Sequence, residues 1–183
     1  VKERIPILLE GTTVKSLKIK LGSVNGIEAD KSMFEQVVKS TKNYNVKIRV
    51  DANGGWNIGD AKYMMQWLAD RGVDYVEQPL KEGEEFNLVE LYENRPVPIY
   101  LDETCRFSEN ISSFAHCIDG VNMKLMKCGG ITEALKIIKT ARKYKLKTMI
   151  GCMSESSVSI AAAAALSGGI DHIDLDSHYN LAP

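Results

Sequence analysis

The alternation of short apolar runs with longer amphipathic segments constrains the fold of this 183-residue chain more than any other feature. Seven runs are typical of strands: SLKIKLG, VKIRVDAN, VDYVEQPL, VPIYLDET, GVNMKLMKCGG, LKTMIGCM and DHIDLD. Between them lie segments whose apolar residues are three and four positions apart, as in a helix. These segments include SMFEQVVKSTK, GDAKYMMQWLADRG, FNLVELYEN, TEALKIIKTARKYK and the small-residue stretch SIAAAAALSGG. The alternation predicts βαβ units and a parallel sheet, which is an α/β fold.

The spacing of these units narrows the fold class further. A repeat of roughly 22–31 residues fits one strand–helix unit of a (β/α) TIM-type barrel, and a whole barrel takes about 250 residues. We therefore expect residues 1–183 to form one partial (β/α) barrel domain of about seven units. The opening VKERIPILLEG is expected to be a helix whose preceding strand lies outside the sequence. Asn57 and Thr132 are predicted to cap the N-termini of two helices.

Composition excludes several classes of protein. The net charge of −1 provides no basic stripe for nucleic acid. The sequence contains no apolar run of about 18 residues that would span a membrane, and no signal peptide opens it. The four cysteines form no CxxC pair, which favours reduced thiols and a cytoplasmic location. Three scattered histidines do not form a zinc motif.

Acidic residues close three successive strand runs, at Asp51, Glu77 and Asp102. Barrel enzymes place their sites at the carboxyl ends of strands, so these side chains are expected to converge. Converging carboxylates repel one another, and a hard divalent cation relieves that repulsion. Ligation by oxygen alone favours one Mg²⁺ over zinc. The alternative is that each acidic residue caps the helix that follows it.

Lysines occur at two of the strand ends. Lys18 and Lys20 share one face of the first run because side chains alternate along a strand, and Lys124 directly follows VNM in the fifth run. A lysine acts as a base only where nearby positive charge favours its neutral form, and Lys18 and Mg²⁺ would both supply such charge to Lys20. The alternative is an edge strand whose lysines prevent aggregation. Asp174 and Asp176 are expected to share a face in the same way.

The pieces KIK, DANGGW, VEQP, LDET and NMKLMKCGG occur in this order and resemble the enolase superfamily, within it the muconate-lactonizing subgroup. The resemblance runs from about Val14 to Asp176. DLD at 174–176 is similar to the eighth-strand aspartate pair of the dipeptide epimerases in that subgroup, and GCMSES at 151–156 to their seventh-strand segment. The aspartate pair of those enzymes holds the substrate's α-ammonium group.

The resemblance implies a role for each candidate residue. Lys20 and Lys124 correspond to the acid/base lysines, and Lys18, Cys152, Asp174 and Asp176 to residues that contact the substrate. The ligands of one Mg²⁺ correspond to Asp51, Glu77 and Asp102. Asn53, Glu103 and Asn122 correspond to residues that orient these ligands and lysines.

The implied activity is a Mg²⁺-dependent 1,1-proton transfer on a dipeptide. One lysine removes the proton α to the carboxylate, Mg²⁺ stabilises the enediolate, and the other lysine returns a proton with inverted configuration. The expected partner is a small-molecule dipeptide rather than nucleic acid or a membrane, and a homo-oligomer is one arrangement that the sequence allows.

Two other interpretations remain open at the level of sequence. An o-succinylbenzoate synthase or muconate cycloisomerase would keep the lysines and metal ligands, but a substrate without an ammonium group has no use for Asp174 and Asp176. An inactive barrel fragment that serves as a scaffold is the other alternative. It is motivated by the N-terminal capping domain of the superfamily, which reads the substrate's side chains and has no counterpart in the sequence.

Overall fold

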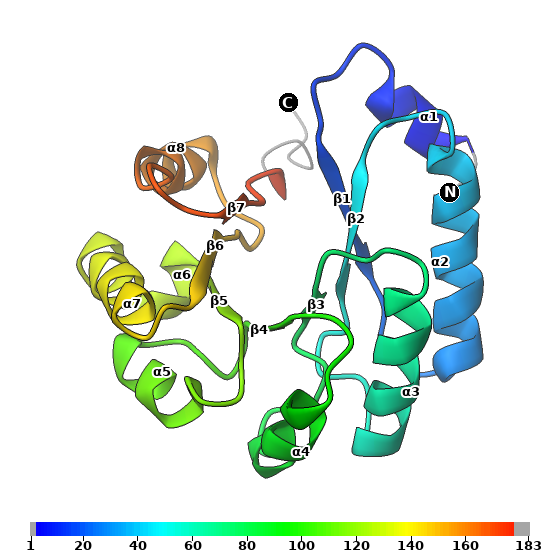
Figure 1. The fold of residues 1–183 in the computed structure, drawn as a ribbon. Coiled ribbons are helices and arrows are strands. Elements are labelled where there is room, and N and C mark those ends of the chain that lie inside the picture. The colour runs from blue at the N-terminus through cyan, green and yellow to red at the C-terminus, as the bar shows by residue number, and fades with distance from the viewer. Residues whose placement is uncertain (1–2, 178–183) are drawn as a thin grey trace. The chain divides into compact units, whose positions relative to one another are not determined.

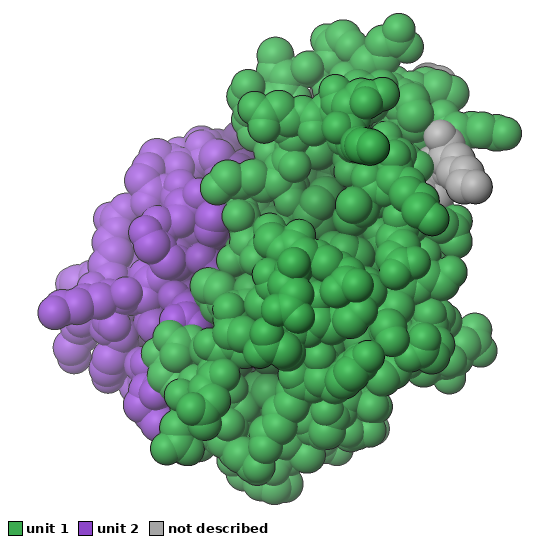
Figure 2. Space-filling view, turned by 45° about the vertical axis from the view of Figure 1, so that its right-hand side comes forward, with its two compact units in different colours: residues 1–99 green, residues 100–183 purple. Residues whose placement is uncertain are grey.

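The computed structural model describes residues 3–177, which form two compact units divided between Ile99 and Tyr100. Figure 2 shows residues 1–99 and residues 100–183 in different colours. Each unit repeats the same local order of a strand followed by a helix (Figure 1).

The first unit is built on parallel strands whose carboxyl ends are aligned. Its strands are β1 (Ser16–Lys20), β2 (Lys47–Asp51) and β3 (Val76–Glu77), and β4 (Ile99–Leu101) starts at its last residue. Its helices are α1 (Arg4–Leu9), α2 (Ile27–Thr41), α3 (Ile58–Ala69) and α4 (Leu88–Glu93), with a 3₁₀ turn η1 (Glu85–Asn87) before α4. The register pairs Lys20 with Asp51, and Asp51 with Glu77. This pairing brings three polar strand ends to one edge of the sheet.

Helices α2 and α3 cover one face of the β1–β2 pair with their apolar sides (Figure 1). Phe34 on α2 is buried and meets Trp67 of α3 edge to face, with ring centroids 5.3 Å apart. Asn57 caps α3 as predicted, because its side chain accepts a hydrogen bond of 2.9 Å from the backbone N–H of Asp60. Burial of this apolar face, rather than helix propensity, is the main source of stability for such helices.

The second unit continues the same pattern. Its strands are β4, β5 (Gly120–Met123), β6 (Lys147–Ile150) and β7 (His172–Ile173), each parallel to the next. Its helices are α5 (Ser108–Phe114), α6 (Leu125–Cys128), α7 (Ile131–Lys143) and α8 (Ser157–Ala165). Strand side chains such as Val121 of β5 and Ile150, the last residue of β6, are buried. Within each unit of residues 3–177, parallel strands alternate with helices, which confirms the predicted α/β fold with TIM-barrel units.

The structure differs from the predicted elements at several places. The fifth strand ends at Met123 instead of continuing through GVNMKLMKCGG, and α6 follows it. Gly129 ends α6 in the left-handed region, at φ 82°, which glycine adopts without strain. Helix α7 begins at Ile131, one residue before Thr132, so Thr132 is not its cap. The predicted helices also omitted α5.

The last strand is shorter than the predicted DHIDLD. Strand β7 ends at Ile173, so Asp174 and Asp176 lie in the segment that follows it. The backbone N–H of Asp174 still donates to the carbonyl of Ile150 over 2.9 Å, which extends the sheet-like contact by one residue. Strand alternation therefore does not by itself place both aspartates on one face.

Two expectations from composition can be compared with the structure. All four cysteines are free thiols, as predicted, and burial raises the pKa of Cys117. Across residues 3–177, no helix has the length and apolar character needed to cross a membrane.

Candidate functional site

The polar edge of the first unit contains two buried carboxylates on neighbouring strands. Asp51 and Glu77 face each other in register and both are fully buried. The Nζ of Lys18 lies 3.0 Å from Oε2 of Glu77, and this lysine is itself largely buried. A charge-assisted contact of this kind offsets part of the cost of burying a carboxylate. The sequence predicted the location of these residues but not the Lys18–Glu77 ion pair.

Asp51 is held by the turn that follows it. The backbone N–H of Asn53 donates to Oδ1 of Asp51 over 2.9 Å, and the side-chain amide of Asn53 donates to Oδ2 over 3.0 Å. Asn53 adopts φ 46°, a left-handed conformation that asparagine tolerates better than most residues. Asn53 therefore contacts the predicted ligand Asp51 through two bonds, as expected of a residue that orients it.

Lys20 ends β1 with an exposed side chain. Its Nζ has no hydrogen-bonding or ion-pair partner among residues 3–177, whereas Lys18 on the same strand face binds Glu77. The two lysines thus differ in environment although they share a strand face. The exposed amine of Lys20 is chemically available to a ligand.

The second unit places two lysines on one buried carboxylate. Asp102 follows β4 and is fully buried, and Nζ of Lys124 lies 2.7 Å from its Oδ2. Lys127 forms an ion pair with Oδ1 of Asp102, and its Nζ donates to the backbone carbonyl of Asp102 over 2.8 Å. Lys127 was not among the predicted site residues. Residues 125–128 form helix α6, which places Lys127 one turn after Lys124 and within reach of the same carboxylate.

The surroundings of Lys124 are tightly packed. Asn122 is fully buried two residues earlier on the same chain segment. Gly151 follows β6, and a Cβ at this position would lie 2.8 Å from Oδ1 of Asn122 and 3.1 Å from Cε of Lys124. Real Cβ atoms essentially never come within 3.0 Å of another heavy atom, so any other residue at 151 would displace Asn122, and it would crowd Lys124.

Glu103 follows Asp102 and is half-buried. Its Oε2 atom is buried and has no hydrogen-bond partner among the described residues. An oxygen in this state is costly and is commonly explained by a missing ion, water or ligand. The structure does not show a contact from the Glu103 side chain to Asp102 or to either lysine.

Cys152, Asp174 and Asp176 are close together after β6 and β7. The thiol of Cys152 donates to the backbone carbonyl of Asp174 over 3.3 Å, and Sγ lies 3.9 Å from Oδ1 of Asp176. Asp176 is exposed and Asp174 is half-buried. The resemblance implied that Cys152 contacts the substrate, and the structure shows its thiol facing the aspartate segment.

The three strand-end acidic residues are not helix caps. The residues in the cap positions of α3, α4 and α5 are Asn57, Asn87 and Phe107. Asp51 instead binds its own turn, while Glu77 and Asp102 bind lysines. The capping alternative considered from the sequence was therefore wrong.

The donor set of these residues suits a hard cation. Asp51, Glu77 and Asp102 supply carboxylate oxygens only, which is the ligand type that Mg²⁺ prefers, and the buried Oε2 of Glu103 adds an unsatisfied oxygen beside Asp102 in the sequence. Within either unit, the described residues contain no group of three histidine, cysteine or acidic side chains that could hold a metal. Asp51 and Glu77 belong to the first unit and Asp102 to the second.

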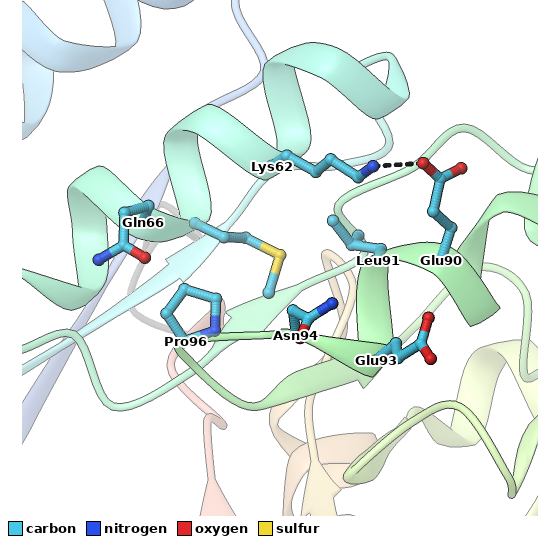
Figure 3. Close-up of a pocket in the computed structure, with 8 residues that line it drawn as sticks. Lys62, Gln66, Glu90, Leu91, Glu93, Asn94 and Pro96 are labelled. Atoms are coloured by element: carbon cyan, nitrogen blue, oxygen red, sulfur yellow. Dashed lines mark hydrogen bonds and ion pairs between the residues drawn. The ribbon is translucent and has the colours of Figure 1, made fainter.

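A separate surface pocket lies between α3 and α4 in the first unit (Figure 3). Lys62 of α3 and Glu90 of α4 form an ion pair at its edge, and Met65 and Pro96 contribute apolar walls. None of the predicted site residues lines this pocket. We therefore do not associate it with the strand-end chemistry.

The family model described as "Enolase C-terminal domain-like" matches residues 4–181. The chain belongs to this family. The membership agrees with the resemblance found in the motifs of the sequence, which fall at the strand ends described above. It also accounts for the parallel strand–helix units.

Two similar relatives carry the same name. It is 76% identical over its whole length to a "Hydrophobic dipeptide epimerase" of Flavobacteria bacterium (strain MS024-2A), and covers 52% of that protein. It is 56% identical over its whole length to a protein of the same name from Roseobacter litoralis, of which it covers 53%. The chain thus spans about half the length of the curated relatives it matches.

A solved structure provides a similar comparison. The dipeptide epimerase of Enterococcus faecalis V583, complexed with Mg and the dipeptide L-Leu-L-Tyr, is similar with a TM-score of 0.85 and 36% identity. The match covers 92% of this chain and 49% of that one. A member of the family with this fold therefore binds both a divalent cation and a dipeptide.

Proposed function

We propose that this protein is a Mg²⁺-dependent epimerase of dipeptides with hydrophobic side chains. The observation that carries the proposal is the placement of a lysine and a buried carboxylate together at the strand ends of each unit. Lys20 pairs in register with Asp51, and Lys124 binds Asp102 directly. The names of the similar relatives and the bound L-Leu-L-Tyr of the E. faecalis structure support the substrate class.

The reaction requires two groups that exchange protons at one carbon. The C–H bond α to the substrate carboxylate breaks, and the proton passes to Nζ of one lysine. The other lysine donates a proton to the same carbon from the opposite face, which inverts the configuration without any net redox change. Lys20 and Lys124 are the residues proposed for these steps.

Asp51, Glu77 and Asp102 are the residues proposed to hold one Mg²⁺. Bound there, the ion would supply positive charge to the substrate carboxylate as negative charge develops on it. Lys18 adds a second cation on the same edge of the first unit, and it contacts Glu77. Asn53 holds Asp51 in one orientation, and we assign similar orienting roles to Glu103 and Asn122.

Asp174 and Asp176 are proposed to bind the ammonium group of the dipeptide. An ammonium group favours carboxylate acceptors, and charge-assisted hydrogen bonds are stronger than neutral ones. Cys152 contacts this segment through its thiol and is proposed to line the same subsite.

The test uses the full-length protein, incubated in D₂O with L-Leu-L-Tyr and a small panel of other dipeptides. We expect α-deuteration and formation of the second epimer by NMR, with loss of both when Mg²⁺ is removed with a chelator. N-acetylated dipeptides, which lack the ammonium group, serve as the matched control and should react poorly. Faster turnover of the acetylated compounds, or turnover that survives complete removal of divalent metal, would contradict the proposal.

A further inference from the structure

A buried carboxylate outside the predicted site joins the two loops that directly follow Lys20 and Asp51. Asp30 belongs to α2 and is only 2% exposed. Its Oδ1 accepts from the backbone N–H of Ser23 over 2.9 Å, and its Oδ2 accepts from the N–H of Gly22 over 3.0 Å. Oδ2 also accepts from Nε1 of Trp56 over 2.8 Å. One carboxylate therefore satisfies three donors from two loops.

The first of these loops directly follows the candidate base. Residues 21–24 come after Lys20 at the end of β1, and the N–H of Leu21 donates to the carbonyl of Asp51 over 2.8 Å. Asp30 thus fixes the backbone two and three residues beyond Lys20. A lysine that directly precedes a mobile loop would lose part of the entropic advantage that a positioned catalytic group provides.

The second loop directly follows the candidate metal ligand Asp51. Residues 52–56 include Asn53, which binds Asp51, and Trp56, which binds Asp30. The N–H groups of Gly54 and Trp56 donate to the carbonyls of Gln78 and Pro79, just beyond Glu77. This loop is therefore connected to both carboxylates of the first unit.

The two loops are in direct backbone contact. A Cβ on Gly22 would collide with the carbonyl oxygen of Ala52, and a Cβ on Gly55 would collide with Cα of Gly22. There is no room for a side chain between the two backbones. The hydrogen bonds to Asp30 and the bond from Leu21 to Asp51 link the two loops. We call residues 21–24 and 52–56 together the two-loop junction.

We propose that Asp30 is a positioning residue that locks the two-loop junction and so fixes Lys20 relative to Asp51. The inference rests on the proposed function for the roles of Lys20 and Asp51. Asp30 touches neither the substrate nor the metal in this assignment; it acts through the loops. The surface charges of α2, such as Glu28, which pairs with Lys31, make no contact of this kind.

The test compares three variants of the full-length protein. Asp30→Asn keeps the shape but replaces one acceptor oxygen with a donor, and Trp56→Phe removes only the indole donor of the second loop. Glu28→Gln is the matched control, because it neutralises an exposed carboxylate on the same helix. Hydrogen exchange resolved to residues 21–24 and 52–56 measures how often the two-loop junction opens. The values of kcat and KM for L-Leu-L-Tyr measure whether Lys20 keeps its position relative to Asp51.

We expect Asp30→Asn to speed exchange in both loops and to lower kcat roughly 10–100-fold, with KM changed less than about threefold, because displacement of a catalytic group acts on the chemical step. Trp56→Phe should shift both measures in the same direction by a smaller factor, and it carries the test if Asp30→Asn does not fold. Glu28→Gln should change neither. Faster exchange in one loop alone, or in both loops without a loss of kcat, would overturn the proposal.

Failure of the proposed function would give a different pattern. If the unmodified full-length protein does not epimerise any dipeptide, the epimerase assignment is wrong whatever the variants do. Hydrogen exchange alone then tests whether Asp30 locks the two-loop junction. Faster exchange in both loops of Asp30→Asn supports this role, and unchanged exchange overturns it.

Discussion

The two candidate bases show how differently the two units hold a lysine. Lys124 is buried and bound to Asp102, which Lys127 contacts from the other oxygen. Lys20 is exposed, and its position is set by strand register with Asp51 and by the loop that follows it. The candidate lysine of the second unit is therefore held by an ion pair, and that of the first by backbone geometry. Two lysines proposed for the same role are thus positioned by different kinds of interaction.

The largest expected effect tests whether this difference matters for chemistry. In the full-length protein, Lys20→Ala and Lys124→Ala should each reduce epimerisation by at least about 10²–10⁴-fold, the range for one acid/base group. Each variant should still exchange the α-proton of one epimer with solvent deuterium through the surviving lysine, as measured by NMR. Near-normal epimerisation by either variant would show that the two lysines are not a pair of bases.

Removal of the Lys127 charge tests how much the ion pairs of Asp102 stabilise the second unit. Lys127→Met leaves Asp102 with one lysine partner fewer, so we expect the free energy of unfolding in urea without Mg²⁺ to fall by about 1.5–3 kcal/mol. The matched control is Lys136→Met, which removes an exposed contact to Glu133 and should cost at most about 0.5 kcal/mol. Equal effects of the two substitutions would mean that charge balance at Asp102 contributes little.

Asp176 offers a smaller effect on substrate binding. Asp176→Asn keeps the shape of the side chain and removes its charge, so KM for free dipeptides should rise by roughly tenfold, which corresponds to about 1.4 kcal/mol. Binding of Mg²⁺, measured by calorimetry, should be unchanged, and so should KM for a substrate without an amino terminus. Unaltered dipeptide kinetics would favour another activity of the subgroup.

The smallest effect concerns how each unit caps a helix. Asn57 caps its own helix α3, whereas α5 receives Glu133 from α7, whose Oε1 accepts from the N–H and the hydroxyl of Ser108. These hydrogen bonds, followed by the contact with Lys136, lower the pKa of Glu133 to about 2 from 4.5. A lowered pKa stabilises the fold above the unfolded value and loses this effect as pH falls through the folded value.

The difference in unfolding free energy between the wild-type protein and Glu133→Gln should therefore be constant above about pH 4.5 and shrink as pH falls toward about 2. Urea titrations at several values of pH in this range measure it. Asn57→Ala should show a loss of stability that does not depend on pH in this window, because an amide does not titrate there. A pH-independent difference for Glu133→Gln would contradict the assignment.

Much of the first unit and of the strand ends could be predicted from sequence. Apolar residues repeat every two positions in a strand and about every 3.6 in a helix, and both patterns can be recognised in a short stretch of sequence. Asp51, Glu77 and Asp102 lie at or just after strand ends, as expected. The failures also have local causes. The apolar residues of KLMKC fit a strand as well as a short helix, and periodicity cannot separate the two over so few residues. Glycines at 129 and 130 then set the start of α7 ahead of Thr132.

Contacts between distant segments could not be predicted in this way. Lys127 binds Asp102 across 25 residues and Asp30 binds Trp56 across 26, and neither pair has a distinctive spacing. An acidic residue in the first turn of a helix is ordinarily favoured by the helix dipole alone, which gave no reason to single out Asp30. Its role follows only from the three donors that meet it in the folded chain.

Gly151 has a consequence for how such a protein can lose or change its activity. The position carries no functional group, yet a single methyl group there would collide with Asn122 and crowd the side chain of Lys124. A mutation to alanine would thus displace Asn122 and crowd the side chain of Lys124, a proposed base, while leaving every titratable residue in place. A search for inactive or repurposed relatives that checks only lysines and carboxylates would miss this change. Such a search should also check glycines, such as Gly151, that leave room for neighbouring polar side chains.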